Sequence, residues 1–274
     1  MTAAPSIVLN NGVDVPQLGI GAWQVGDDTI EDVVVAALQI GYRHVDTAAA
    51  YGNERGVARG LEDAGVPRED VFVTTKLGND SHGYDNALAA LDTSLGRLGT
   101  DYVDLFLINW PLPHLGLGAD TWRALEQAYA DGRARAIGVS NFTERHLDDL
   151  ARTWEVVPAV NQIEIHPTFT QEALRATCEE RGIVVEAYSP LGRGQDLVEP
   201  LVQEIARRTR ATPAQVVLAW HLALGHVVFP KTVRAERLVE NLAALDLVLD
   251  REDLERLSAL DRGNRTGPDP DTFV

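Results

Sequence analysis

Short apolar segments alternate with longer segments of helical periodicity along this chain, and the alternation predicts its fold. Eight apolar segments are rich in β-branched residues and short enough to be strands. They cover residues 18–23, 42–46, 71–76, 103–109, 134–140, 159–163, 183–188 and 227–231. Between them, apolar residues recur every three or four positions, which predicts helices. These helices cover residues 29–40, 53–64, 84–98, 120–130, 143–151, 171–181 and 212–224.

The order of these elements favours a closed barrel. Continuously apolar strands that alternate with helices are typical of a parallel sheet covered by helices. Eight such units in 274 residues favour a (β/α)8 TIM barrel, with an open doubly wound sheet as the alternative. No linker or low-complexity segment divides the chain, so we predict a single domain over residues 1–274.

Three further segments are additions to the barrel. Residues 6–9 and 13–17 flank the turn sequence Asn10-Asn11-Gly12, which predicts an N-terminal β-hairpin before the first barrel strand. Residues 198–208 and 251–260 have the periodicity of two additional helices. The tail 263–274 contains two prolines and is predicted to be an extended loop.

Charge and composition exclude several classes of function. The chain has 24 basic and 41 acidic residues, a formal net charge of −17, so it lacks the positive field that nucleic acid or an anionic membrane surface requires. No apolar run approaches the ~18 residues of a membrane span. Residues 1–12 do not resemble a signal peptide, so we expect a cytoplasmic protein. A single cysteine, Cys178, allows no intramolecular disulfide and no cysteine-based metal site, and we expect no metal.

Polar residues stand at the ends of seven successive predicted strands. In a (β/α)8 barrel the carboxyl ends of the strands meet at one mouth, where the chemistry occurs. Strands also end in polar residues simply because loops are exposed to water. For any single position, solvent exposure and a functional site are therefore both possible explanations. Seven in succession favour a shared site. The residues are Asp46, Lys76, Asn109, Ser140 with Asn141, Gln162 with Glu164, Tyr188 and Lys231.

The usual nucleotide-binding and hydrolase motifs are missing. Neither Gly19-Ile20-Gly21 nor Gly192-Arg193-Gly194 has the glycine spacing of a dinucleotide fingerprint. The chain also lacks the P-loop, the HExxH zinc motif and the GxSxG elbow. A nucleotide, if bound, is therefore bound without a Rossmann loop.

Eight segments in order along the chain resemble the aldo-keto reductase superfamily, nearest in type to the bacterial 2,5-diketo-D-gluconate reductases. They are Gln17-Leu-Gly-Ile-Gly, Gly41-Tyr-Arg-His-Val-Asp-Thr-Ala, Tyr51-Gly-Asn-Glu, Val73-Thr-Thr-Lys-Leu, Asp101-Tyr-Val-Asp-Leu-Phe-Leu-Ile, Ile137-Gly-Val-Ser-Asn-Phe, Val160-Asn-Gln-Ile-Glu-Ile-His-Pro and Phe229-Pro-Lys-Thr-Val. The superfamily has the same (β/α)8 barrel that the pattern predicts.

The resemblance implies hydride transfer from NADPH to the carbonyl carbon of a small-molecule substrate, with Tyr51 as the proton donor. A phenol with a pKa near ~10 donates protons readily but is a poor base unless positive charge stabilises the phenolate. Lys76 can supply that charge, and Asp46 can hold the ammonium in place. The structural alternatives are a core aromatic for Tyr51 and a simple ion pair for the other two residues.

The resemblance also implies the cofactor contacts. Ser140, Asn141 and Gln162 match the residues that hold the nicotinamide carboxamide, and Tyr188 matches the aromatic that stacks on its ring. A basic cluster around Lys231 matches the 2′-phosphate site, which favours NADPH over NADH. Only Lys76 and Lys231 are lysines, and the other 22 basic residues are arginines. The remaining cofactor contacts implied are Gly21, Ser189, Leu191, Thr232, Val233, Arg237, Glu240 and Asn241.

Two positions depart from the family pattern. Asn109 stands where the family usually has histidine, and an amide can donate a hydrogen bond but cannot titrate. Gly78 stands where related sequences often have a bulky aromatic, which predicts a wider pocket. Because of Asn109, a reductase of imines or activated C=C bonds and a cofactor-sensing subunit with weak catalysis remain alternatives. Trp23 and Trp110 are predicted to contact the substrate.

The histidines and the assembly state complete the predictions. His44, His166 and His221 lie in or beside apolar segments and are interpreted as structural. No segment is left over for docking a partner chain, and we expect a monomer.

Overall fold

Eight parallel strands form a ring in the computed structural model, which describes residues 4–273. The predicted domain and tail also include residues 1–3 and 274, which lie outside the described residues. The strands pair in the order of the chain: β3 (Ile20–Gly21), β4 (His44–Asp46), β5 (Phe72–Leu77), β6 (Val103–Ile108), β7 (Ala134–Ser140), β8 (Val160–Glu164), β9 (Val184–Tyr188) and β10 (Val227–Val228).

The ring closes between its first and last strands. Leu18 pairs in parallel with Val228, and the Gly19 amide donates to the Val228 carbonyl at 2.8 Å. A Cβ on Gly21 would lie 2.8 Å from the Phe229 carbonyl oxygen, so only glycine fits at this approach. The closure confirms the predicted (β/α)8 barrel, and the open-sheet alternative is wrong.

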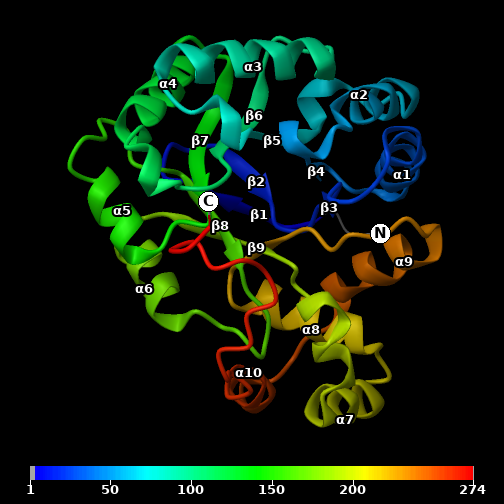
Figure 1. Cartoon of the computed structure of the whole chain (residues 1–274). Coiled ribbons are helices and arrows are strands. Elements are labelled where there is room, and N and C mark those ends of the chain that lie inside the picture. Colours follow the sequence, from blue (N-terminus) through cyan, green and yellow to red (C-terminus); the bar gives the residue numbers. More distant parts are fainter. Residues whose placement is uncertain (1–3, 274) are drawn as a thin grey trace.

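Helices surround the ring, as Figure 1 shows. Those predicted are present with bounds shifted by at most two residues: α1 (Asp27–Ile40), α2 (Glu54–Asp63), α3 (Tyr84–Leu98), α4 (Gly118–Ala130), α5 (Glu144–Leu150), α6 (Glu172–Glu180) and α8 (Pro213–Ala223). The two additional helices are α7 (Pro200–Thr209) and α10 (Arg251–Ser258). Short 3-10 helices are η1 (Ala49–Tyr51), η2 (Arg68–Asp70), η3 (Asn79–Ser81), η4 (Pro113–Leu115), η5 (Gly192–Gly194), η6 (Asp196–Val198) and η7 (Ala243–Asp246).

One helix, α9 (Ala235–Leu242), was not among the predicted helices. Its segment contains charged residues that we assigned to a phosphate site, although Leu238 and Leu242 have the four-residue spacing of a helix face. Leu238 and Leu242 are buried against the core, while Arg237 is exposed. The helix follows β10 and so completes the eighth strand–helix unit.

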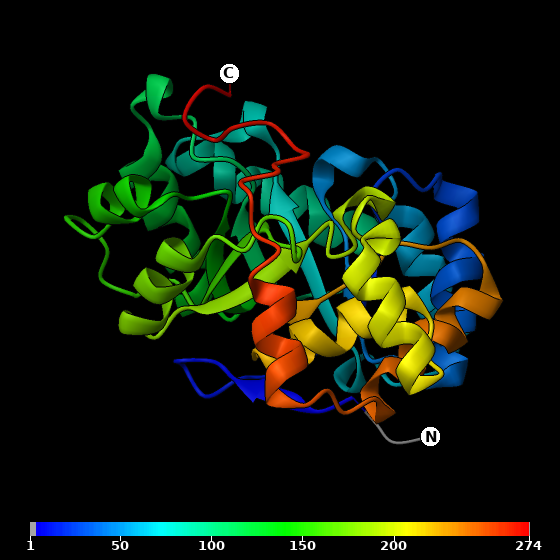
Figure 2. The same ribbon diagram turned by 90° about the horizontal axis from the view of Figure 1, so that it is seen from below.

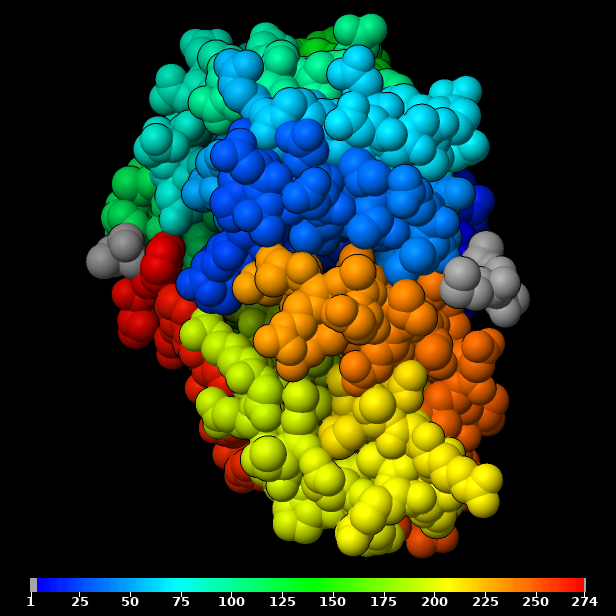
Figure 3. Space-filling view, turned by 90° about the vertical axis from the view of Figure 1, so that its right-hand side faces the viewer, coloured from blue at the N-terminus to red at the C-terminus, as the bar shows by residue number. Residues whose placement is uncertain are grey.

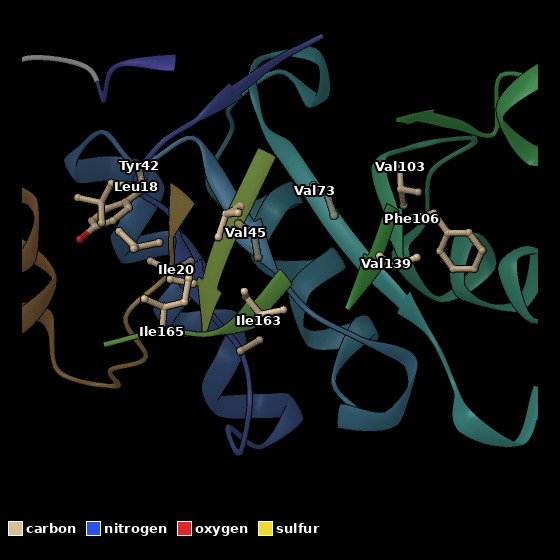
Figure 4. Packing of buried hydrophobic residues seen from close by; sticks show 14 of the residues in the cluster. Leu18, Ile20, Tyr42, Val45, Val73, Val103, Phe106, Val139, Ile163 and Ile165 are labelled. Atoms are coloured by element: carbon tan, nitrogen blue, oxygen red, sulfur yellow. The ribbon is translucent and has the colours of Figure 1, made fainter. Parts of the chain in front are cut away.

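The core has two layers because neighbouring strand residues point to opposite faces. Phe106 and Ile108 pack between the sheet and the helices. Leu105 and Leu107 alternate with them and fill the barrel interior. Burial of both faces explains why the strands are continuously apolar. Figure 4 shows part of the outer layer, with Val45 and Val73 on the adjacent strands β4 and β5 and Val139 on β7.

The predicted hairpin closes the amino-terminal end of the barrel. β1 (Ser6–Val8) pairs antiparallel with β2 (Asp14–Pro16). The Asn10 amide donates to the Pro158 carbonyl at 3.0 Å and the Asn11 amide donates to the Arg135 carbonyl at 2.9 Å. Val15 is wholly buried in the interior layer. Figure 2 shows the hairpin at one end of the molecule and the C-terminal segment at the other, so the open mouth is at the carboxyl ends of the strands.

The tail forms neither helix nor strand over residues 263–273, as expected. No helix within residues 4–273 is both long and apolar enough to cross a bilayer.

Candidate active site

A cavity of about 780 Å³ opens at the carboxyl ends of the strands. Figure 3 shows two of the segments around it, with the one after β10 (orange) facing the one after β9 (yellow-green). Most predicted site residues line this cavity: Gly21, Trp23, Asp46, Tyr51, Asn109, Trp110, Ser140, Asn141, Gln162, Tyr188, Ser189, Leu191, Lys231 and Arg237. The structure therefore brings together residues that lie far apart in the sequence.

Lys76 lies behind the cavity wall and touches both Asp46 and Tyr51. Its Nζ donates to the two Asp46 carboxylate oxygens at 2.7 and 2.9 Å, to the Thr47 carbonyl at 2.9 Å and to Tyr51 Oη at 3.4 Å, so that two of these acceptors share one of its three hydrogens. Burial alone would lower the pKa of Lys76, but the Asp46 carboxylate and Tyr51 raise it above its usual value. Lys76 is therefore a fixed positive charge beside the phenol.

Tyr51 belongs to η1, which follows β4 directly and holds the phenol at the mouth. Burial raises the pKa of Tyr51, and the Lys76 charge offsets only part of that rise. The sequence predicts that Lys76 stabilises the phenolate, but the effect of burial on the pKa of Tyr51 is the larger one. Since Tyr51 Oη accepts from Lys76, its own hydrogen is free to be donated into the cavity.

Asn109 and the two predicted substrate residues form the outer part of the cavity. Asn109 follows β6, and its carbonyl accepts from the Asn141 side chain at 2.8 Å. Trp110 stacks on Phe273 of the tail, with ring centroids 4.0 Å apart. Trp23 lies under the Arg193 guanidinium, 5.3 Å from its ring centroid. The tail and the loop after β9 thus reach the substrate end of the cavity.

The residues predicted for the nicotinamide are joined by hydrogen bonds. Ser140 Oγ donates to the Gln162 carbonyl at 2.8 Å, and Tyr188 Oη donates to Asn141 Oδ1 at 2.7 Å. The Gln162 side-chain amide donates to Asp46 Oδ2 at 2.9 Å. Asn141 and Ser189 adopt left-handed backbone angles, with φ of 63° and 47°. Such a connected network holds amide and hydroxyl groups in defined orientations.

Glu186 was missed by the sequence analysis. It lies on β9, wholly buried, and accepts from the Gln162 amide at 2.9 Å. Burial and the nearby Asp46 raise its pKa to about 8. The signal that could have found it is an acidic residue inside an otherwise apolar predicted strand.

The other end of the cavity carries the basic residues. Lys231 and Arg237 both line it, from the loop after β10 and from α9. The remaining residues assigned to the adenosine end lie outside the lining: Thr232, Val233, Glu240 and Asn241. They nevertheless flank Arg237 on or just before the same helix. The cavity therefore has an amide-rich end and a cationic end.

A second buried cluster holds the C-terminal tail. Glu164, at the end of β8, accepts from the Thr266 amide at 2.6 Å, the Thr266 hydroxyl at 2.5 Å and the Gly267 amide at 2.9 Å. His166 lies between Glu164 and Asp196, with nitrogen–oxygen distances of 3.2 and 2.9 Å. Gly267 lines the cavity, so this cluster positions part of its wall.

The hydrogen bonds in this cluster favour the ionised form of its carboxylates. Burial opposes ionisation of Glu164, but hydrogen bonds from His166, Thr266 and Gly267 lower its pKa to about 2. Burial likewise opposes a charge on His166, but Asp196 and Glu164 raise its pKa. Both ring nitrogens of His166 face carboxylate oxygens, an arrangement that favours its protonated form and gives it a structural role.

Comparison with known proteins finds a matching family and similar proteins of known sequence and structure. The model of the aldo/keto reductase family matches residues 17–262. An aldo-keto reductase of Mycolicibacterium smegmatis is 48% identical over 270 residues, which are 98% of each chain. The glyoxal reductase of Bacillus subtilis is 45% identical over 271 residues, 98% of this chain and 97% of that protein. A crystal structure of a Gox0644 variant in complex with NADPH has a TM-score of 0.96 and 43% identity, and covers 100% of both chains.

Proposed function

Because this chain belongs to the aldo/keto reductase family of NADP-dependent oxidoreductases, we propose that it reduces the carbonyl group of small aldehydes and ketones to an alcohol. The observation that carries the proposal is the set of Tyr51, Lys76 and Asp46 at the mouth of the cavity. NADPH supplies the hydride, as the complex of the Gox0644 variant with NADPH suggests.

The cavity fits a phosphorylated dinucleotide. Its amide-rich end offers Ser140, Asn141 and Gln162 to a carboxamide, and Tyr188 offers a ring face. Its cationic end offers an ammonium and a guanidinium, which suit phosphate oxygens. In a chain of net charge −17, this local pair supplies the positive field that the whole surface lacks.

Tyr51 protonates the carbonyl oxygen in the proposed reaction. Its hydrogen is free to donate, because the oxygen already accepts from Lys76. As the proton leaves, negative charge develops on Tyr51 Oη, 3.4 Å from the Lys76 ammonium, which stabilises it. Asp46 keeps this ammonium charged and in place through two hydrogen bonds. Asn109 can donate a hydrogen bond to the same carbonyl oxygen but cannot supply a proton.

We propose dicarbonyls as the preferred acceptors. The 45% identity to a glyoxal reductase supports this class. The resemblance of the sequence to the 2,5-diketo-D-gluconate reductase type favours the same class and stays a prediction. The cytoplasmic location and the monomeric state that the sequence leads us to expect stay predictions.

The experiment follows NADPH absorbance with a panel of aldehydes, ketones, dicarbonyls, imines and enones. Tyr51→Phe removes the proton donor and is expected to lower carbonyl turnover by about 10²–10⁴-fold. The matched control is Tyr129→Phe on α4, which makes the same chemical change outside the cavity lining. Full carbonyl turnover by Tyr51→Phe would show that the proposed acid is wrong.

The cofactor preference has its own test. Arg237→Leu is expected to weaken NADPH binding by about tenfold and to leave NADH binding nearly unchanged, because it removes one charge-assisted bond to the 2′-phosphate. Equal affinity of the wild type for both cofactors would contradict the role given to Lys231 and Arg237.

Asn109 favours a second candidate function, reduction of imines or activated C=C bonds. The same panel decides, with Asn109→His as the informative variant. If the wild type reduces enones or imines faster than carbonyls and Asn109→His reverses the order, the second function is correct. If NADPH binds tightly and no acceptor is reduced, the chain is a cofactor sensor.

A further inference from the structure

The side-chain amide of Gln162 has both of its hydrogens occupied by carboxyl groups. Its Nε2 lies 2.9 Å from Asp46 Oδ2 and 2.9 Å from Glu186 Oε2. A primary amide has two N–H donors and one carbonyl oxygen. The oxygen of Gln162 is therefore the group left to face the cavity, which this residue lines.

The opposite orientation of the amide is unfavourable. It would place the amide oxygen against the Asp46 carboxylate and turn the donors away from it. A buried carboxylate that loses its donor is destabilised. The Asp46 carboxylate thus determines which end of the amide faces the cavity.

The two carboxyl groups contribute differently. A bond to Asp46 alone leaves the amide free to rotate, because the torsion next to a planar amide has a broad energy minimum. A second bond, to Glu186, fixes the plane. Gln162 and Glu186 are register partners on β8 and β9, so the backbone holds their side chains in line.

Glu186 is placed to orient the Gln162 amide but not to contact a ligand directly. It is wholly buried and does not line the cavity, so it reaches a ligand only through Gln162. Its Oε1 has no hydrogen-bond partner within residues 4–273. With a pKa of about 8, Glu186 is mostly neutral at pH 7 and can accept from Gln162 without placing a second anion beside Asp46.

We propose that Glu186 is a positioning residue for the nicotinamide ring, because it fixes the plane of the Gln162 amide whose oxygen receives the carboxamide N–H. The inference rests on the proposed function, in which Gln162 binds the carboxamide. A fixed acceptor selects one orientation of the carboxamide, and hence one face of the ring turned toward the substrate.

The test compares two ligands that differ in the nicotinamide. NADP+ carries the ring, and 2′-phospho-ADP-ribose lacks it but keeps every phosphate. Glu186→Leu removes the acceptor and is expected to weaken NADP+ binding by about tenfold, which corresponds to one hydrogen bond. Binding of 2′-phospho-ADP-ribose should stay within twofold of the wild type, which also shows that the variant is folded.

Two further variants separate positioning from general stability. Glu186→Gln keeps a carbonyl acceptor for Gln162 and is expected to restore NADP+ binding to within about threefold of the wild type. Asp253→Asn is the matched control, since Asp253 on α10 is a buried carboxyl that pairs with Arg208 of α7 and lies outside the cavity lining. It should leave the ratio of the two dissociation constants unchanged.

A second readout is the face of the ring from which the hydride leaves. With NADPH deuterated on one face of C4, the wild type should transfer only one of the two hydrogen isotopes to the substrate. Glu186→Leu should transfer a mixture, and Glu186→Gln should restore a single label. A merely structural role of Glu186 would not change this ratio.

The outcomes distinguish this inference from the proposed function. If Glu186→Leu binds both ligands as the wild type does, or loses both equally, Glu186 does not position the ring and the proposed function stands. If the wild type itself binds NADP+ no more tightly than 2′-phospho-ADP-ribose, Gln162 does not hold the carboxamide. That result overturns the cofactor contact in the proposed function, and this inference with it.

Discussion

Glu164 and Glu186 lie on adjacent strands, both wholly buried, and their pKa values move in opposite directions. Burial opposes ionisation of both. Glu164 receives donors from His166, Thr266 and Gly267, and its pKa falls to about 2. Glu186 receives one donor, from Gln162, and its pKa rises to about 8. Burial and the Asp46 charge keep Glu186 protonated, whereas the hydrogen bonds to Glu164 outweigh burial and favour its carboxylate.

The two states suit two different tasks. An ionised Glu164 binds the backbone of the tail tightly, because hydrogen bonds to a charged acceptor are the strong ones. A neutral Glu186 orients an amide beside Asp46 without adding charge to the site that holds Lys76. Glu164 on β8 therefore anchors the tail segment that forms part of the cavity wall, and Glu186 on β9 orients Gln162 inside the cavity.

The largest expected effect comes from removing the cation that the Glu164 cluster needs. His166→Leu leaves Glu164 and Asp196 buried without their shared partner, and we expect a loss of about 3–5 kcal/mol in the free energy of unfolding, measured with urea. The matched control is His44→Leu, because His44 is also buried but its pKa is lowered by burial, so it is neutral. It should lose only about 1–2 kcal/mol. Equal losses would mean that the charge of His166 is unimportant.

The pH dependence should show the two carboxyl groups with opposite signs. Glu186, flanked by Asp46 and Lys76, keeps its proton in the folded state between pH 4.5 and about 8, where the unfolded chain releases it. Stability from this group is complete below pH 4.5 and falls by up to ~1.4 kcal/mol per pH unit as pH rises to about 8. The free energy of unfolding of Glu186→Gln minus that of the wild type should therefore increase with pH in this window.

The stability that Glu164 contributes should depend on pH in the opposite direction; this carboxyl is flanked by His166. Its folded pKa is about 2 against an ordinary 4.5, so its contribution is present above pH 4.5 and is lost as pH falls toward 2. The free energy of unfolding of Glu164→Gln minus that of the wild type should therefore decrease as pH rises from about 2 to 4.5. The same slope for both variants, in urea titrations across pH, would refute the comparison.

The smallest expected effect tests a single donor to Glu164. Thr266→Val removes the hydroxyl bond of 2.5 Å but keeps the backbone bond, and should cost about 1.5 kcal/mol in the free energy of unfolding. Because Gly267 lines the cavity, KM for the carbonyl substrate should rise as well. The control is Thr272→Val in the exposed part of the tail, which should cost less than about 0.5 kcal/mol. A loss as large in the control would show that the tail is held elsewhere.

The sequence predicted the barrel and the inward-facing site because both follow from local patterns. Alternating segments indicate the strands and helices, and polar residues at strand ends indicate the mouth. The hydrogen bonds between Glu164 and the tail could not be predicted in this way, because Glu164 and Thr266 are 102 residues apart in the sequence. The charge state of Glu186 depends on the burial of its surroundings, which no spacing of residues expresses. The helix α9 was missed because its charged residues had been given to the phosphate site.

The closure of the barrel has a consequence for the lifetime of the protein. The ring is joined by its two shortest strands, β3 and β10, of two residues each. Gly21 lies on one edge of this seam and Lys231 just beyond the other, and both line the cavity. On the proposed function, one NADPH molecule touches both edges and ties them together. Because ligand binding adds to the free energy of opening, the cofactor becomes a structural part of the barrel, and the loaded enzyme should outlast the empty one.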